Sequence, residues 1–290
     1  MLRIRIAGRK FRIPTHWEDI TLAQCAWLYH KVNEQSPALL DYYRSFASDM
    51  APEPYADIDD LTRFTSEVIG YFADIPVDLM LQIRNNDIMT LAMAVLPRFV
   101  VGVLGIVDYP VKGIASFRYR GRRYNLPKSG ADIAGELTPL SGVTAIEFCL
   151  LSDIVCAGNM AMAPLAVAIV CRRKRERYSE EVAQKRAALF GSLPASVFWE
   201  LWALASGAHQ YLRSAFPNCY GKAGEGDSAD KSEPAVWCDT LVGMAADKPS
   251  ELDSLQRMNA YDFVHLLSES IKRKTEEWKM KAALASCGVR

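Results

Sequence analysis

The sequence predicts a mainly α-helical chain with two small β-hairpins, an α+β arrangement. Apolar residues recur at helical spacing through most of the 290 residues. Two segments, residues 2–13 and 117–126, instead alternate polar and apolar side chains around a glycine, which is the pattern of a hairpin. Hydrophobic residues make up 50% of the chain and charged residues 23%, so we expect a packed globular core.

Charge and cysteine content narrow the class of protein. The 34 basic residues balance the 34 acidic ones, which argues against bulk attraction to nucleic acid or to an anionic membrane and leaves only a local patch for such contacts. The first residues alternate in polarity and resemble no signal peptide. The seven cysteines form no Cys-x-x-Cys pair, so we expect free thiols in a reducing cytoplasm; the alternative is an exported protein with six paired cysteines.

After the first hairpin, apolar periodicity predicts helices. We expect one helix from residues 15–21 onward and others over 37–50, 58–73 and 77–96. Residues 88–107 are almost wholly apolar and long enough to span a bilayer. Because Pro97 and Arg98 lie at the centre of this stretch, we interpret it as two buried helices that meet near Pro97.

The hairpin pattern occurs twice. Ile4–Pro14 and Phe117–Pro127 align without a gap and are identical at four of eleven positions. Each copy is followed by a capping box, Thr21-Leu-Ala-Gln24 in the first and Thr144-Ala-Ile-Glu147 in the second. These correspondences predict an internal duplication of a hairpin–helix unit. The alternative is that any glycine-centred hairpin leading into a capped helix looks this way.

The rest of the chain divides at a polar stretch. Helices are expected over 162–170, 180–190 and 196–212, before a segment rich in Gly, Ser, Lys, Asp and Glu. We therefore predict a hairpin plus helical module over residues 1–110, a second such module over 111–217, a flexible linker over 218–234 and a helical C-terminal segment over 235–290. Proteolysis is expected to cut first within the linker.

The C-terminal segment is too short to build a robust core alone, so we expect it to dock on the first domain, on another copy or on a partner. Its apolar side chains are the kind that anchor protein interfaces. The candidate partner-binding residues are Trp237, Leu241, Met244, Tyr261, Phe263, Leu266, Leu267 and Trp278. Packing against the parent domain is the alternative.

No pattern of catalytic or cofactor chemistry stands out. Residues 221–226 lack the spacing of a phosphate-binding loop, the four histidines form no zinc-binding pair, and no nucleophile elbow occurs. We therefore expect a non-enzymatic protein without catalytic residues, cofactor or metal. The basic run over residues 172–177 and the hairpin arginines fit a solvated surface better than binding of nucleic acid or of an acidic partner, which remain the alternatives.

The order of these features resembles the phage tail assembly chaperones, over roughly residues 1–212. The motifs that carry the resemblance are Gly8–Pro14 with Trp17–Leu22, Gly121–Pro127 with Thr144–Phe148, and the run from Ala168–Cys171 through Tyr178–Glu181 to Leu193–Val197. The resemblance implies a cytoplasmic holdase, in the bacterial host cell, that coats the tape measure protein and recruits tail tube subunits with no cofactor. The tail after Gly221 is less typical of the family.

Two other functions remain open from the sequence. The chain could be a structural neck, adaptor or baseplate component that stays in the phage particle, or a nucleic-acid-binding module. A chaperone should be absent from the finished particle, whereas a structural component should be retained. A nucleic-acid-binding module should bind with strong salt dependence through its arginines.

Overall fold

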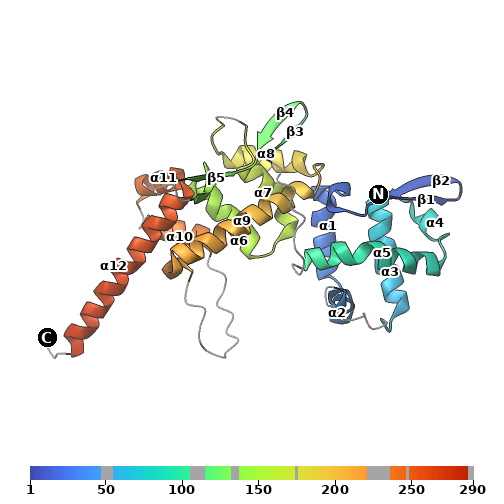
Figure 1. Cartoon of the computed structure of the whole chain (residues 1–290), viewed down its shortest axis with the longest axis horizontal. Coiled ribbons are helices and arrows are strands. Elements are labelled where there is room, and N and C mark those ends of the chain that lie inside the picture. Colours follow the sequence, from blue (N-terminus) through green and yellow to red (C-terminus); the bar gives the residue numbers. More distant parts are fainter. Residues whose placement is uncertain are drawn as a thin grey trace.

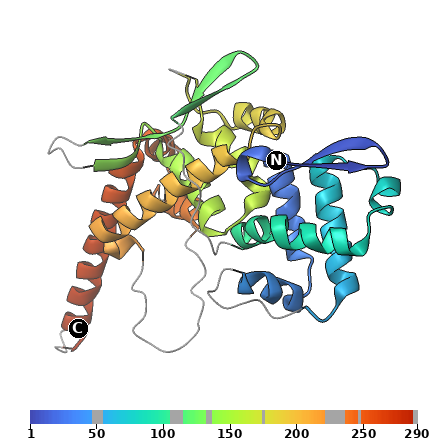
Figure 2. The same ribbon diagram turned by 45° about the vertical axis from the view of Figure 1, so that its right-hand side comes forward.

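The computed structural model describes residues 1–46, 55–104, 115–131, 137–173, 176–220, 236–245 and 248–286. It confirms the predicted fold class, a mainly helical chain with small two-stranded antiparallel sheets. The hairpins lie along one side of the molecule, and the helices form the body beneath them (Figures 1 and 2). The predicted helices over 58–73 and 180–190 form with those bounds.

Both predicted hairpins form, with the same register and the same turn. β1 (Leu2–Ile6) pairs with β2 (Arg9–Ile13), and β3 (Ser116–Tyr119) pairs with β4 (Arg122–Asn125). The two turn residues have positive φ in each case, 46° and 79° at Ala7 and Gly8, and 47° and 74° at Arg120 and Gly121. This is the pattern of a type I′ turn, whose twist matches that of the flanking strands. Two independent glycine-centred hairpins would share this geometry too, so the duplication stays a prediction.

A third hairpin was not predicted. β5 (Lys128–Ala131) pairs with β6 (Leu137–Ser141), with an irregular register between Lys128 and Gly130. No clear alternation of polar and apolar residues marks these strands, so the sequence offered little signal for them.

The first helical module contains α1 (Leu22–Asn33), α2 (Pro37–Ser45), α3 (Ile58–Ala73), the short α4 (Val77–Met80) and α5 (Asn85–Val103). The expected continuous helix over 77–96 is wrong, because the chain breaks between α4 and α5. Arg84 is extended, and Asn85, Asn86 and Asp87 then open α5 with short polar side chains that favour a helix start.

The expected break near Pro97 is also wrong, because α5 runs through it. Proline has no amide hydrogen to donate to the carbonyl of Met93. Because Met93 is 45% exposed, water can donate a hydrogen bond to this carbonyl instead. The neighbouring Leu96 and Phe99 are fully buried and hold the helix against the core. None of the described helices has the length together with the apolar character that a membrane span requires.

The second module contains α6 (Ala145–Cys156), the 3-10 turn η2 (Met160–Met162), α7 (Ala163–Val170), α8 (Glu180–Phe190) and α9 (Ser196–Ala215). The modules predicted over 1–110 and 111–217 are joined through their cores. Trp17, in the 3-10 turn η1 (Trp17–Asp19) of the first module, packs edge-on against Trp199 of α9, with ring centroids 4.7 Å apart.

The starts of α1 and α6 are held in the same way. The amide of Leu22 donates to the carbonyl of Leu193, and the amide of Ala195 donates to Ile20. At α6, the corresponding bonds run from Ala145 to Met258 and from Ala260 to Val143. In each case, residues around the capping box form a short antiparallel bridge with the turn that precedes a later helix. That helix is α9 for α1 and α12 for α6.

The C-terminal segment docks on the second module. It contains α10 (Trp237–Met244), α11 (Pro249–Arg257) and α12 (Ala260–Ser286), all of which contact α6. The second half of α12 projects away from the body as a single exposed helix (Figure 1). Residues 218–220 of the predicted linker belong to the folded body, because Asn218 bonds to Ser268 of α12, and residues 221–234 lie outside the described residues.

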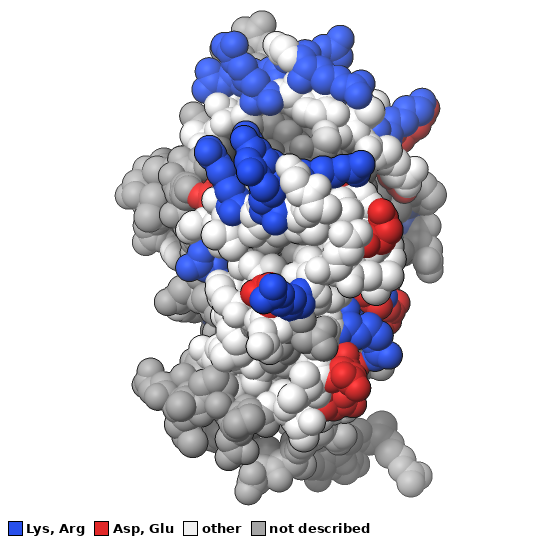
Figure 3. Space-filling view, turned by 90° about the vertical axis from the view of Figure 1, so that its right-hand side faces the viewer, with Lys and Arg blue, Asp and Glu red and all other residues white. Residues whose placement is uncertain are grey.

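Charge is unevenly placed on the N-terminal end of the molecule. Lysine and arginine side chains gather at the upper end of this face, on the side where the hairpins lie, whereas acidic side chains lie mainly along one lower edge (Figure 3). The balanced net charge of the chain therefore conceals a local excess of positive charge.

Candidate functional site

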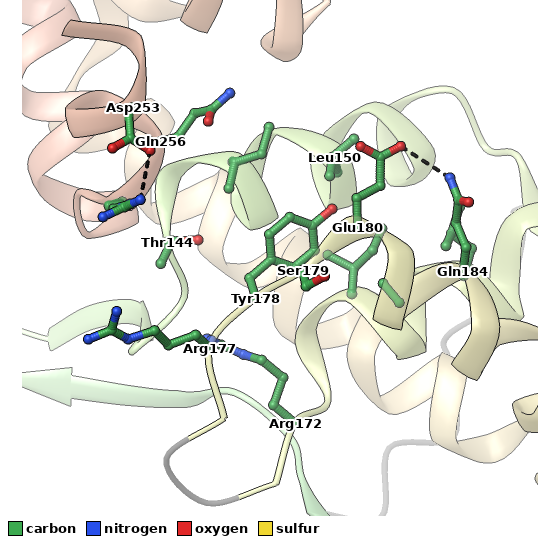
Figure 4. Close-up of a pocket in the computed structure, with 15 residues that line it drawn as sticks. Thr144, Leu150, Arg172, Arg177, Tyr178, Ser179, Glu180, Gln184, Asp253 and Gln256 are labelled. Carbon is green, nitrogen blue, oxygen red and sulfur yellow. Dashed lines mark hydrogen bonds and ion pairs between the residues drawn. The ribbon is translucent and has the colours of Figure 1, made fainter. Parts of the chain in front are cut away.

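A groove with a volume of about 780 Å³ lies between α6, α7, α8 and α11 (Figure 4). Its apolar lining comes mainly from α6 and α7, which contribute Ile146, Leu150, Leu165 and Ile169. Helical periodicity places Ile146 and Leu150 one turn apart on the same face of α6. The groove therefore offers an apolar floor to a partner.

Polar groups surround this floor and differ between the two ends. Arg172 and Arg177 lie towards one end, and Glu180 and Gln184 lie towards the other (Figure 4). Gln184 Nε2 donates to Glu180 Oε1 over 3.1 Å. On the α11 side, Asp253 and Arg257 form an ion pair of 3.0 Å at the rim. The groove is therefore positively charged towards one end and negatively charged towards the other.

Tyr178 lies between the two ends of the groove (Figure 4). Burial, followed by the nearby carboxylates of Glu180 and Glu147, raises the pKa of Tyr178 to about 12. Its hydroxyl therefore stays protonated at neutral pH and can donate a hydrogen bond to a bound partner.

The arginine end is fixed by a buried ion pair. Glu147, fully buried at the start of α6, accepts hydrogen bonds of 2.8 Å from both the amide and the hydroxyl of Thr144. Arg172 Nη2 donates to Glu147 Oε2 over 2.9 Å, and Arg172 Nε lies 2.8 Å from Oε1 as an ion pair without hydrogen-bond alignment. Burial raises the pKa of Glu147, while Arg172 and Thr144 act in the opposite direction.

Arg172 also ties the second hairpin to the helices. Its backbone carbonyl accepts from the amide of Asn125 in β4 over 3.0 Å, and its side chain donates to the carbonyls of Gly142 and Glu176. The sequence had placed this arginine on a solvated face. The structure corrects that placement, because the side chain is 17% exposed and is held by three groups, the Glu147 carboxylate and the carbonyls of Gly142 and Glu176.

Most of the candidate partner-binding residues in the C-terminal segment pack on the chain itself. Trp237, Leu241, Phe263 and Leu267 are buried, with relative exposures of 6% or less. Met244, Tyr261 and Leu266 are partly buried against the same core. These seven residues thus follow the alternative that the sequence left open, packing on the parent domain. Trp278 differs, since 74% of it is exposed on the projecting half of α12.

A second polar cluster escaped the sequence analysis because its members are far apart in the chain. His209 of α9 lies 2.9 Å from the Ser152 hydroxyl through Nε2 and 3.1 Å from the Tyr220 hydroxyl through Nδ1. Burial, with a smaller effect from Arg213, lowers the pKa of His209 to about 4, so the imidazole is neutral at pH 7. Because Ser152 is only 1% exposed, its hydroxyl is not accessible, and the hydrogen bond to His209 joins α6 to α9 in the interior.

Within the described parts of the chain, no group of three His, Cys, Asp or Glu side chains is placed to hold a metal ion. Comparison with known proteins adds no relative. No family model, no curated protein and no solved structure matches this chain.

Proposed function

We propose that this chain is a non-enzymatic phage tail assembly chaperone, which holds tape measure and tail tube proteins in the bacterial cytoplasm during virion morphogenesis. The observation that carries the proposal is the open groove with an apolar floor formed by α6 and α7. A groove of this kind suits the apolar face of an amphipathic helix, a recurrent mode of protein recognition. The resemblance of the sequence motifs to those of tail assembly chaperones suggests the class of partner.

The charges at the two ends of the groove favour one direction of the bound helix. A helix carries partial negative charge at its C-terminus and partial positive charge at its N-terminus. We expect the C-terminal end of the partner helix near Arg177, which is exposed, and its N-terminal end near Glu180. Arg172 positions this end of the groove but is already paired with Glu147.

Co-expression with the tape measure protein tests the proposal. The wild-type chain should keep that protein soluble, and the double variant Leu150→Asp, Leu165→Asp should not, because two carboxylates in the floor repel an apolar face. The matched control is Val242→Asp, which adds a carboxylate at a site that is 55% exposed on α10, outside the groove. Thermal denaturation of both variants checks that the fold survives. Equal solubility of the tape measure protein with and without the wild-type chain would refute the proposal.

A structural component of the particle is the second candidate, and the projecting half of α12 favours it. This helix extends from the body with Trp278 and Met280 exposed by 74% and 65%, as expected for an arm that inserts into a neighbouring subunit. Mass spectrometry of purified virions separates the two candidates. Retention of the chain at a fixed stoichiometry would identify a neck, adaptor or baseplate component, whereas its absence would support a chaperone.

A further inference from the structure

The outer face of the first hairpin carries a block of four cations. Arg3 lies directly opposite Arg12, and Arg5 lies directly opposite Lys10. Because side chains alternate along a strand, these four share one face, while Ile4, Ile6, Phe11 and Ile13 share the other. Directly opposed Cβ atoms lie about 5 Å apart, so like charges in such pairs destabilise the sheet.

The second hairpin repeats the feature. Arg118 lies opposite Arg123, and Arg120 and Arg122 are at the tip. The cationic side chains of both hairpins are exposed. They are Arg3, Arg5, Arg9, Lys10, Arg12, Arg118, Arg120, Arg122 and Arg123.

Within the described residues, no carboxylate forms an ion pair with these nine cations. The segments 1–13 and 115–131 contain no Asp or Glu at all. The first acidic residues after the first segment are Glu18 and Asp19. Asp19 is occupied by the N-terminal ammonium at 3.0 Å and by the backbone amides of Thr15 and His16. The repulsion between opposed cations is therefore left for an external anion to relieve.

A hollow of about 400 Å³ borders the second hairpin and extends the positive surface onto α8. Its cationic lining includes Arg120, Arg122 and Arg173. The partly exposed ring of Tyr119 also lines it, whereas the ring of Tyr124 is buried behind it. Arg120 lies 5.4 Å from the centre of the Tyr119 ring. Cations interleaved with aromatic rings are typical of surfaces that bind nucleic acid, where phosphates meet the cations and bases stack on the rings.

We propose that the two hairpins form a surface that binds the phosphate backbone of nucleic acid. Both hairpins project from the same side of the molecule, where the cations gather in the space-filling view (Figures 2 and 3). An acidic protein partner is less suitable, because the outer face of the first hairpin has no apolar anchor of the kind that protein interfaces use. Arginine, which supplies eight of the nine cations, is suited to bidentate binding of phosphate.

Fluorescence anisotropy of a labelled short DNA duplex, titrated with the full chain, tests this surface. The logarithm of affinity should fall linearly with the logarithm of salt concentration between about 50 and 200 mM, with a slope of about 0.9 per phosphate contacted. The double variant Arg3→Glu, Arg5→Glu should bind at least about tenfold more weakly, with a salt slope smaller by about 2. Its carboxylates would face Arg12 and Lys10, so its Tm should equal or exceed that of the wild type.

The control is Lys279→Glu, Lys281→Glu, which makes the same change of charge on the exposed part of α12 and should leave DNA affinity within about twofold. Arg120→Glu, Arg122→Glu should weaken binding separately through the second hairpin. The proposal is overturned if the wild type fails to bind DNA at low salt, or if the control variant loses as much affinity as the first-hairpin variant. Competition by poly-glutamate as effective as that by unlabelled DNA would also overturn it, in favour of an acidic protein partner.

Discussion

The indole of Trp17 lies directly against the Cα of Gly102, in space that a larger residue at this position would need. A Cβ atom built on Gly102 would come within 2.5 Å of Trp17 Cζ2, much closer than carbon atoms approach. Trp17 also meets Phe99 of α5 and Trp199 of α9, with ring centroids 5.0 and 4.7 Å away. These contacts of Trp17 therefore join the first and second modules, and they require a residue without a side chain at position 102.

Gly102→Ala should destabilise the protein by about 1–3 kcal/mol, because Trp17 must shift within a packed core. The measurement is the free energy of unfolding from urea denaturation. Gly207→Ala is the matched control, since Gly207 lies in α9 with no atom within 4 Å of an added Cβ. That control should stabilise the protein by up to about 1 kcal/mol through helix propensity. A neutral or stabilising effect of Gly102→Ala would contradict the close contact.

Arg172→Met should cost about 3–5 kcal/mol of unfolding free energy, because it leaves the fully buried carboxylate of Glu147 without its cation. Adding Glu147→Gln should recover a large part of this loss. Gln24 occupies the corresponding capping position of α1 without any ion pair, so the fold accommodates an amide there. Urea denaturation of the two single variants and the double variant measures the coupling, and additive losses would show that the pair does not interact.

Acidification should weaken the protein through His209. Its pKa is lowered to about 4 in the folded state from an ordinary value of 6.5, so the unfolded chain binds the additional proton between these values. The stabilising contribution is therefore complete above pH 6.5 and is lost as the pH falls towards 4. We expect a loss of about 2 kcal/mol, reduced from the value for full burial because the ring is partly exposed.

Urea denaturation at several pH values between 4 and 7 measures this slope. His209→Phe removes the titrating group and should flatten the dependence over the same range. Gln210→Phe is the control, because it adds the same ring at an exposed position of α9 that carries no titrating group. An identical pH dependence in wild type and His209→Phe would assign the effect to other groups.

Ala7→Asn should stabilise the first hairpin by about 0.5–1 kcal/mol. Ala7 has a φ of 46°, which costs energy for alanine, whereas Asn-Gly is the preferred pair for a type I′ turn. The Tm from thermal denaturation should rise by a few degrees. Ala23→Asn, at an exposed helical position, is the control and should lower the Tm. A fall in Tm for Ala7→Asn would contradict the turn assignment.

Local signals in the sequence were enough to predict much of this fold. The hairpins were predictable because their glycines and alternating side chains act within a dozen residues, and the structure reproduces both with one register. The capping boxes at Thr21 and Thr144 were predictable for the same reason. The break before Asn85 had a local signal as well, in the short polar residues that open α5, but the apolar periodicity on either side obscured it.

The candidate groove could not be predicted, because it is built from residues more than a hundred positions apart, from Thr144 to Arg257. The same holds for the Arg172–Glu147 pair, since charge patterns in the sequence favour neighbouring partners and the true partner is 25 residues away. The sequence pattern of the aromatic residues in the C-terminal segment is the same for packing on a partner and for packing on the parent domain, so it could not distinguish the two.

The sequence by itself determined the first two hairpins and most of the helices, because hydrogen bonding, capping and turn geometry act over a few neighbouring residues. Only the tertiary structure decided which apolar faces are covered. Burial depends on which helices meet, so Trp237 became part of the core while Trp278 remained exposed, and α5 continued through Pro97 because its flanking side chains had a core to enter.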